Sequence, residues 1–139
     1  MVIDPSTEKG SKVTRWLQDD IVAWLVTVAS DGTPTPTPVW FWWDGETLLV
    51  YSQPDKPKLR HIAANRRVAI ALSLDDIGDL RAVVTGDAEV DVAGPAAFEL
   101  PGYIDKYRSE IARLGSNPEE FSAAYSVPIR IRPTRVRAW

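Results

Sequence analysis

Residues 34–67 constrain the fold of this chain more than any other part of the sequence. They contain two runs of strand length, separated by Asp44-Gly45, and then a short helical pattern that begins at Pro57. An Asp-Gly pair between two such runs is typical of a tight β-hairpin, and proline suits the first turn of a helix. The segment therefore predicts antiparallel strands at residues 35–43 and 47–52, followed at once by a helix.

A cluster of positive charge stands at the start of this predicted helix. It consists of Lys56, Lys58, Arg60 and His61, and the nearest acidic residue is Asp55. Cations at a helix N-terminus oppose the helix dipole, so a bound anion would offset their repulsion. Free backbone N–H groups at a helix start also suit a phosphate. Two interpretations stay open here, an anion site and a solvated basic turn.

The other strands are predicted from apolar runs and from two-residue alternation. The apolar residues 21–29 predict a buried strand, with Trp16 and Trp24 expected in the core. Further strands are expected at residues 68–74, 80–92 and 127–139. Gly86 indicates a bulge or sharp bend, and Pro133 indicates a break in the alternation of the last strand.

Helices are expected at residues 11–20, 57–65 and 102–114, with another that begins after an Asn117 cap. Six strands joined by hairpins suit a small closed or partly closed barrel. The sequence therefore predicts a mainly β fold with a few helices. We expect one domain over residues 11–139, preceded by a mobile segment at residues 1–10.

The composition excludes several classes of site. The chain of 139 residues has no cysteine and one histidine, which excludes disulfides, thiolate metal sites and multi-histidine zinc sites. The acidic turn with Asp75, Asp76 and Asp79 is expected to be solvated, so no metal is predicted. Any redox chemistry would therefore depend on a bound organic cofactor.

The charge and hydropathy patterns limit the kinds of partner that the protein can bind. A net charge of −3 argues against a general nucleic-acid binder, since affinity for a phosphate backbone needs an excess of Lys and Arg. No run approaches the ~20 apolar residues of a membrane span, and the first residues lack the apolar core of a secretory signal. We expect a cytoplasmic protein whose local basic cluster takes a small anionic ligand.

Three pieces of sequence, taken in order, resemble a known family. They are T-P-V-W-F-W-W-D-G at 37–45 followed by Tyr51-Ser52, then K-P-K-L-R at 56–60, and the ending R-P-T-R-V-R-A-W. Their order and spacing are similar to the split-barrel family of pyridoxamine 5′-phosphate oxidase, and within it to the flavin/deazaflavin oxidoreductases of the B group. The resemblance covers residues 16–139. It implies an FMN-binding split barrel, a six-stranded antiparallel Greek-key barrel, that forms a homodimer with the cofactor site at the interface.

The resemblance also implies which residues hold the cofactor. The backbone of Thr37, Pro38, Val39 and Trp40 would run along the cofactor ring. Tyr51 and Ser52 would approach the ribityl chain and phosphate. Lys56 and Lys58, with Arg60 as a third, would hold the phosphate through charge-assisted hydrogen bonds.

Two cofactors fit this resemblance, FMN and coenzyme F-420, an 8-hydroxy-5-deazaflavin with a lactyl-polyglutamate tail. B-group proteins mostly bind coenzyme F-420. Five cations near the predicted helix, Lys56, Lys58, Arg60, Arg66 and Arg67, exceed what one phosphate requires. This excess favours the anionic tail, and therefore coenzyme F-420, over FMN.

The implied activity is hydride transfer between the deazaflavin and a small electron-poor organic substrate, an enone or a quinone-like molecule. Trp40, Trp42 and Trp139 could form an apolar wall for it. The proton donor stays open among Tyr51, Tyr103, Tyr107 and Tyr125. The alternatives are an FMN-dependent oxidase or reductase and a non-catalytic protein that binds a cofactor or haem, for which His61 is a candidate ligand.

Overall fold

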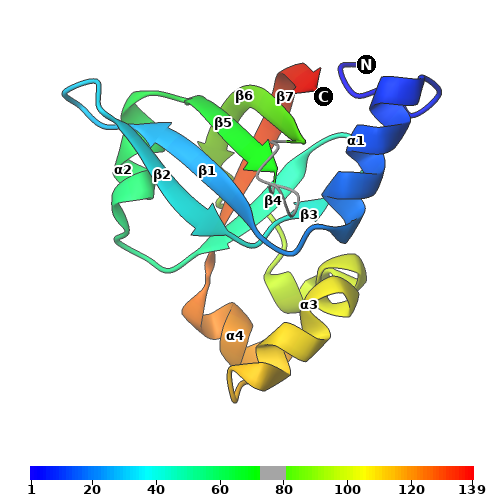
Figure 1. Ribbon diagram of the computed structural model, residues 1–139. Coiled ribbons are helices and arrows are strands. Elements are labelled where there is room, and N and C mark those ends of the chain that lie inside the picture. Colours follow the sequence, from blue (N-terminus) through cyan, green and yellow to red (C-terminus); the bar gives the residue numbers. More distant parts are fainter. Residues whose placement is uncertain (73–80) are drawn as a thin grey trace.

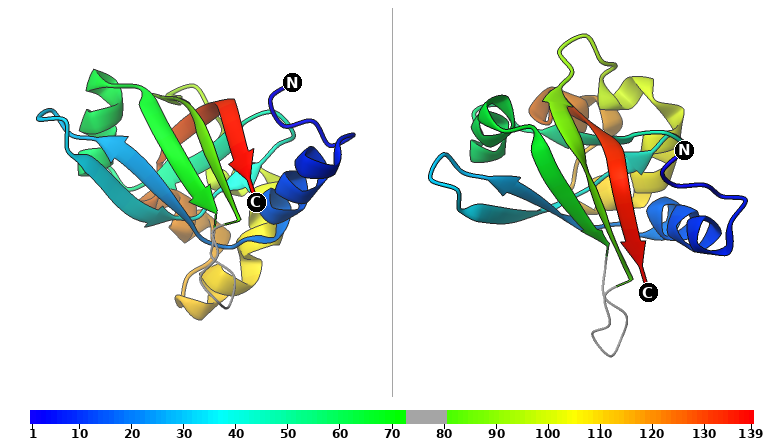
Figure 2. Two further views of the ribbon diagram at one scale, coloured as in Figure 1. Left: turned by 45° about the horizontal axis from the view of Figure 1, so that its top comes forward. Right: turned by 90° about the horizontal axis from the view of Figure 1, so that it is seen from above.

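One strongly curved antiparallel sheet forms the centre of the structure (Figures 1 and 2). The computed structural model describes residues 1–72 and 81–139. Its strands are β1 (Ala23–Val28), β2 (Pro34–Val39), β3 (Trp42–Trp43), β4 (Leu48–Ser52), β5 (Arg67–Leu72), β6 (Ala82–Val90) and β7 (Val127–Ala138). They lie in the order β2-β1-β5-β6-β7-β4-β3. The expected mainly β, barrel-like fold is confirmed.

The described residues form seven strands, not six, because the strand expected at 35–43 is two strands. β2 ends at Val39 and pairs with β1, whereas β3 begins at Trp42 and pairs with β4. These two strands are the opposite edges of the sheet. Trp40 and Phe41, which we call the edge link, therefore carry the chain across the split between the edges.

Helix α3 (Pro101–Arg113) holds the edge link in place. The hydroxyl of Tyr107 accepts a hydrogen bond from the Phe41 N–H at 2.8 Å and lies 2.7 Å from the Ile21 carbonyl oxygen, to which it can donate. The Lys106 ammonium donates to the carbonyls of Phe41 at 2.9 Å and Leu17 at 3.2 Å. The buried backbone of the link thus gains from side chains the partners that a strand would supply.

Lys106 is held in apolar surroundings, with its ammonium 3.8 Å from the centre of the Phe41 ring. Burial lowers the pKa of Lys106 to about 8, although Asp20 and Asp19 favour its charged form. Near neutral pH the ammonium therefore keeps its charge and its hydrogen bonds to the two carbonyls.

The remaining helices lie around the sheet (Figure 1). They are α1 (Glu8–Asp19), α2 (Pro57–Ala64), the short 3-10 helix η1 (Ala97–Glu99) and α4 (Pro118–Ala124). α1 begins three residues before the expected position because the Thr7 hydroxyl accepts from the Gly10 N–H and caps it. Residues 1–10 include the first turn of α1, and Ile3 lies in the core. No helix among the described residues is long and apolar enough to cross a membrane.

Two groups of buried side chains lie on either side of the sheet wall. The larger fills the curved sheet and includes Val39, Phe41 and Trp43. The smaller joins Leu49 and Tyr51 of β4 to η1, α3 and α4, which Figure 1 shows beneath the sheet. Val39, Phe41 and Trp43 alternate along the chain, and all three face the barrel core.

Trp24 was expected in the core, and this prediction was wrong, because its side chain is 50% exposed. Only one face of β1 is covered, and Trp24 belongs to the other face. The strand register places one row of side chains across this outer face: Pro38, Trp24, Ala71, Val83 and Arg137. We call this set the outer row. Trp16 is partly buried and packs against the core.

The expected irregularity of β6 and β7 is confirmed. Their register shifts between Thr85 and Gly86, and Gly86 lies opposite Pro133. A side chain at position 86 would clash with the carbonyl oxygen of Arg132, so glycine is required for the close approach. The acidic turn expected at 75–79 lies outside the described residues.

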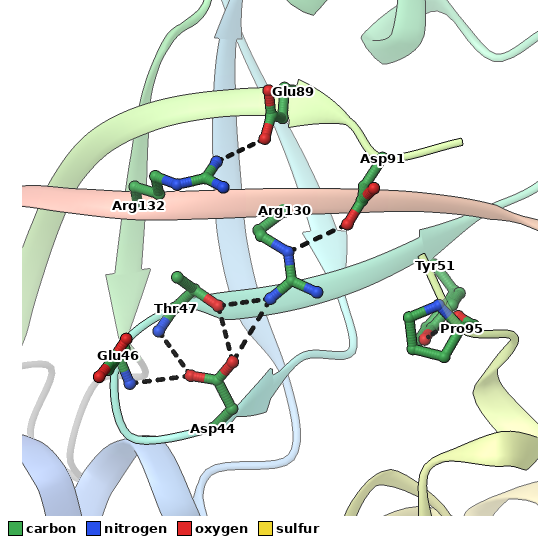
Figure 3. Close-up of polar contacts among 9 residues, drawn as sticks. All are labelled: Asp44, Glu46, Thr47, Tyr51, Glu89, Asp91, Pro95, Arg130 and Arg132. Carbon is green, nitrogen blue, oxygen red and sulfur yellow. Dashed lines mark hydrogen bonds and ion pairs between the residues drawn. The ribbon is translucent and has the colours of Figure 1, made fainter. Parts of the chain in front are cut away.

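Arg130 ties three parts of the barrel together (Figure 3). Its guanidinium donates to Asp91 at 3.1 Å, beyond β6, and to Thr47 at 2.7 Å, in the β3–β4 turn. Asp44 accepts from the N–H groups of Glu46 and Thr47 and lies 3.4 Å from Arg130. Burial raises the pKa of Asp44, but these donors and Arg130 lower it overall, so the carboxylate stays charged. The expected Asp44-Gly45 hairpin is therefore confirmed, and Arg130 of β7 holds its turn in place.

We predict that Tyr107→Phe destabilises the protein, because it leaves the buried Phe41 N–H without its partner. A loss of about 1–3 kcal/mol in the free energy of unfolding is expected. Tyr103→Phe, one turn earlier on α3, is the matched control, since its hydroxyl makes no hydrogen bond with any described residue. Urea denaturation of both variants measures the difference; equal losses in the two variants would contradict the role assigned to Tyr107.

Candidate functional site

A cavity of about 170 Å³ opens where the sheet is split. β2 and the edge link supply Pro38, Val39 and Trp40; β4 supplies Tyr51 and Ser52; the following loop and α2 supply Gln53, Lys56 and Lys58; and the helical region supplies Tyr103, Leu114, Phe121 and Tyr125. Seven of the nine residues predicted for a cofactor site line this one cavity. Residues far apart in the sequence are thus brought together around one cavity.

Thr37 and Arg60 are the two predicted residues that do not line the cavity. Thr37 lies opposite Leu25 in the β1–β2 ladder, and its side chain points to the face opposite that of Pro38. Arg60 is exposed on α2. His61 does not line the cavity either; its Nδ1 lies 2.8 Å from the Thr27 hydroxyl, which ties α2 to β1.

One end of the cavity is cationic. Lys56 and Lys58 form no ion pair with any of the described residues. Burial and the neighbouring charge of Lys56 lower the pKa of Lys58. The backbone N–H of Lys58 also lacks a hydrogen-bond partner within residues 1–72 and 81–139, because α2 starts without a side-chain cap. Two ammonium groups and one N–H are therefore available to an anion.

The backbone that leads into this end has an unusual conformation. Asp55 has a φ of 63°, in the left-handed region that non-glycine residues rarely adopt. The turn directs the chain from β4 into α2, so that Lys56 and Lys58 follow Ser52 along the same cavity. Such residues are often found at binding sites.

The other end of the cavity is aromatic. Trp40 stacks on Tyr107 with ring centroids 4.7 Å apart and on Phe121 at 5.4 Å, and Tyr125 stacks on Phe121 at 4.6 Å. These contacts pack the aromatic rings of the wall against one another. In the described part of the chain, no charged side chain other than the two lysines lines the cavity.

Comparison with known proteins identifies the family. The family model for pyridoxamine 5′-phosphate oxidase matches residues 11–139. The chain belongs to this family. A search of curated proteins gave no match.

Solved structures of the same fold include an F-420 reductase, which is 32% identical over 88% of this chain and 94% of its own, with a TM-score of 0.66. A putative pyridoxamine 5′-phosphate oxidase from Listeria innocua is 23% identical over 92% and 95% of the two chains, with a TM-score of 0.66. The haem storage protein of Vibrio cholerae is 15% identical over 99% and 95%, with a TM-score of 0.64. The last two show the fold alone.

Within this pyridoxamine 5′-phosphate oxidase-like fold, fewer of the five cations near α2 lie at the cavity than the sequence suggested. Arg66 pairs with Asp87 at 3.8 Å. Arg67 lies with Arg135 and Arg137 around a separate hollow on the outer face of β5, β6 and β7. Only Lys56 and Lys58 of the five cations line the cavity, so the charge argument for an anionic tail loses much of its support.

The apolar wall of the cavity also differs from expectation. Trp40 contributes to it, but Trp42 packs closely against Gly102 and Trp139 is 64% exposed near the end of β7. Sequence reasoning missed Gln53, Leu114 and Phe121, and left Tyr103 and Tyr125 only as possible proton donors. No sequence pattern indicated that α3 and α4 cover the split.

The free edge of β2 offers hydrogen-bond acceptors without donors. Prolines at 34, 36 and 38 have no N–H, so the ladder with β1 must use the N–H groups of Thr35, Thr37 and Val39. The carbonyls of the prolines then point to the open edge. A ligand beside β2 therefore meets carbonyl oxygens, and another strand cannot extend the sheet there in the usual way.

The group of three or more His, Cys, Asp or Glu side chains that a metal ion would need is absent from the described residues. Asp75, Asp76 and Asp79, the acidic turn considered in the sequence, lie outside them.

We predict that phosphate binding at the cationic end weakens as the pH rises. A bound anion favours charged Lys58, whose pKa is already below its ordinary value in the free protein. Affinity should therefore be full near neutral pH and fall as Lys58 loses its proton, before an exposed lysine would. Titration with inorganic phosphate at about pH 7 and about pH 10, followed by NMR of the lysine side chains, tests this. Affinity that stays constant across this range would contradict it.

Proposed function

We propose that this protein is an oxidoreductase that binds coenzyme F-420 in the cavity at the sheet split and transfers a hydride between it and a small electron-poor organic substrate. The observation that carries the proposal is the cavity itself, which combines a wall of stacked aromatic rings with two lysines that form no ion pair with a described residue. The F-420 reductase, at 32% identity, supports the choice of coenzyme. The absence of cysteine also leaves the chemistry to a bound cofactor.

The residues present fit such a coenzyme. Lys56, Lys58 and the N–H of Lys58 suit its phosphate, and the Pro38 carbonyl suits a donor on the rim of its ring. When bound, the coenzyme supplies or accepts a hydride at one ring carbon. Trp40, fixed between Tyr107 and Phe121, limits how a flat molecule can lie and excludes water from that side.

FMN is the second candidate cofactor, and one observation favours it. The cavity gathers two lysines, which suffice for a single phosphate, whereas Arg66 and Arg67 are engaged or located elsewhere. An FMN-dependent oxidase or reductase would use the same cationic end. The two candidate cofactors therefore differ in the part of the molecule beyond the phosphate, where coenzyme F-420 carries its lactyl-polyglutamate tail.

We predict that oxidised coenzyme F-420 binds with micromolar or higher affinity, and more tightly than FMN. Ring fluorescence of each cofactor, titrated side by side, measures both. The double variant Lys56→Ala/Lys58→Ala should lose about 100-fold or more in affinity, because it removes two charge-assisted contacts. Lys12→Ala, which changes an exposed lysine on α1, is the matched control. Tighter FMN binding would move the protein to the second candidate, and binding of neither would contradict the proposal.

We also propose that two copies pack through the outer row to complete the site. Trp24, 50% exposed, lies beside Pro38, which also lines the cavity, so the exposed apolar face and the cavity are continuous. The acceptor-only edge of β2 disfavours association by strand addition. A partner must therefore pack face to face, which would cover Trp24 and give the cavity a further wall.

We predict that Trp24→Glu converts a dimer to a monomer, because it places a charge in the centre of this face. Light scattering after size-exclusion chromatography measures the mass. Phe98→Glu, at an equally exposed aromatic on η1, is the control and should leave the mass unchanged. A wild-type protein that is already monomeric at high concentration would refute the shared site.

A further inference from the structure

Four tyrosines were candidates for a polar role toward the substrate, and the structure separates them. The Tyr51 hydroxyl donates to the Pro95 carbonyl at 2.7 Å, and the Tyr107 hydroxyl is occupied at the edge link. Tyr103 and Tyr125 line the cavity, and their hydroxyls make no hydrogen bond with a described residue. Two hydroxyls therefore remain for a ligand.

Tyr103 is the more rigidly held of these two. Its ring lies 5.1 Å from that of Tyr51, 5.0 Å from that of Tyr107 and 6.2 Å from that of Phe121. Tyr125, in contrast, packs on Phe121 and is only partly buried. A hydroxyl fixed on three sides loses little freedom when it binds a ligand.

The Tyr103 hydroxyl faces the cavity. The residue is 1% exposed, yet within the described chain every fully buried side-chain polar atom has a hydrogen-bond partner. Because the Tyr103 hydroxyl has none among these residues, it must form the small accessible part of the side chain. That part borders the cavity that Tyr103 lines.

The chemistry of this hydroxyl is that of a donor. Burial, with smaller contributions from Tyr107, Tyr51 and Tyr125, raises the pKa of Tyr103 well above its ordinary value. The hydroxyl therefore keeps its proton at all ordinary pH and is a poor general acid. Its suitable partner is a neutral acceptor, because the aromatic end supplies no charge for a carboxylate or an amine.

We propose that Tyr103 donates a hydrogen bond to a carbonyl oxygen of a small, planar, apolar substrate held against Trp40, Phe121 and Tyr125. This assignment rests on the proposed function in that the bound carbonyl compound is taken as the substrate of that reaction. The enone or quinone-like substrate expected from the sequence carries such a carbonyl oxygen. The lysines at the other end are left to the phosphate of the cofactor.

A thermodynamic cycle tests the hydrogen bond without any coenzyme. Acetophenone and ethylbenzene are similar in shape, but only the first has a carbonyl oxygen. Both are titrated into wild-type protein and Tyr103→Phe, with binding followed by protein-observed NMR. Tyr103→Phe should weaken acetophenone binding about tenfold, as expected for one net hydrogen bond, and change ethylbenzene binding less than twofold.

Tyr125→Phe is the matched comparison in the same cavity. If Tyr125→Phe weakens the binding of acetophenone but not of ethylbenzene, and Tyr103→Phe does not, the assignment to Tyr103 is overturned. Absence of acetophenone binding to the wild type, or equal losses for both ligands in Tyr103→Phe, would also overturn it. Unchanged NMR spectra outside the cavity confirm that the variants are folded.

The cofactor titration separates this inference from the proposed function. Tyr103→Phe should leave the affinity for coenzyme F-420 and FMN within twofold of the wild type. A large loss of cofactor affinity would instead place Tyr103 against the ring and overturn its role toward the substrate. Failure of both cofactors to bind would refute the proposed function and leave the outcome of the ligand cycle unaffected.

Discussion

The hydroxyl of Tyr107 stands where the chain leaves one edge of the sheet and joins the other. At the edge link, Phe41 has buried backbone groups that pair with none of the described strands, and unpaired groups of this kind are costly. Tyr107 and Lys106 supply the partners, so α3 must dock at the split. The same docking places Tyr103, one helical turn away, on the cavity. The contact that stabilises the fold is thus also the one that builds the aromatic end of the site.

The cavity has two chemically distinct ends because two different parts of the chain meet at the split. The loop from β4 into α2 brings Lys56 and Lys58, which form no ion pair with a described residue, and the helices below the sheet bring aromatic rings. Between them runs β2, whose alternate prolines leave only carbonyls on its open edge. That edge is protected from pairing with another strand, yet it stays open to a ligand that donates hydrogen bonds.

Local patterns predicted local features well. Asp44-Gly45, Gly86 and the lysines of α2 carry their own backbone or charge requirement, and each lies where the sequence placed it. The break between β2 and β3 at Trp40 could not be predicted, because the alternation of apolar side chains continues through it and Phe41 still faces the core. The exposure of Trp24 could not be predicted either. An apolar strand has the same sequence pattern whether its second face is covered by this chain or left open. Both failures concern long-range packing, which two-residue periodicity does not record.

The choice between the two cofactors depends on charge beyond the phosphate. Arg66 and Arg67 follow the basic cluster closely in sequence, but the strand that begins at Arg67 carries them away from Lys56 and Lys58. One copy of the chain therefore provides for a phosphate and, at this end of the cavity, little more. Arg67 and Arg137 lie on the outer face that continues from Pro38 past Trp24, the face through which two copies are proposed to pack. If a polyglutamate tail is bound at all, its counter-charges must come from outside the cavity, which makes the cofactor preference and the assembly of two chains aspects of one question.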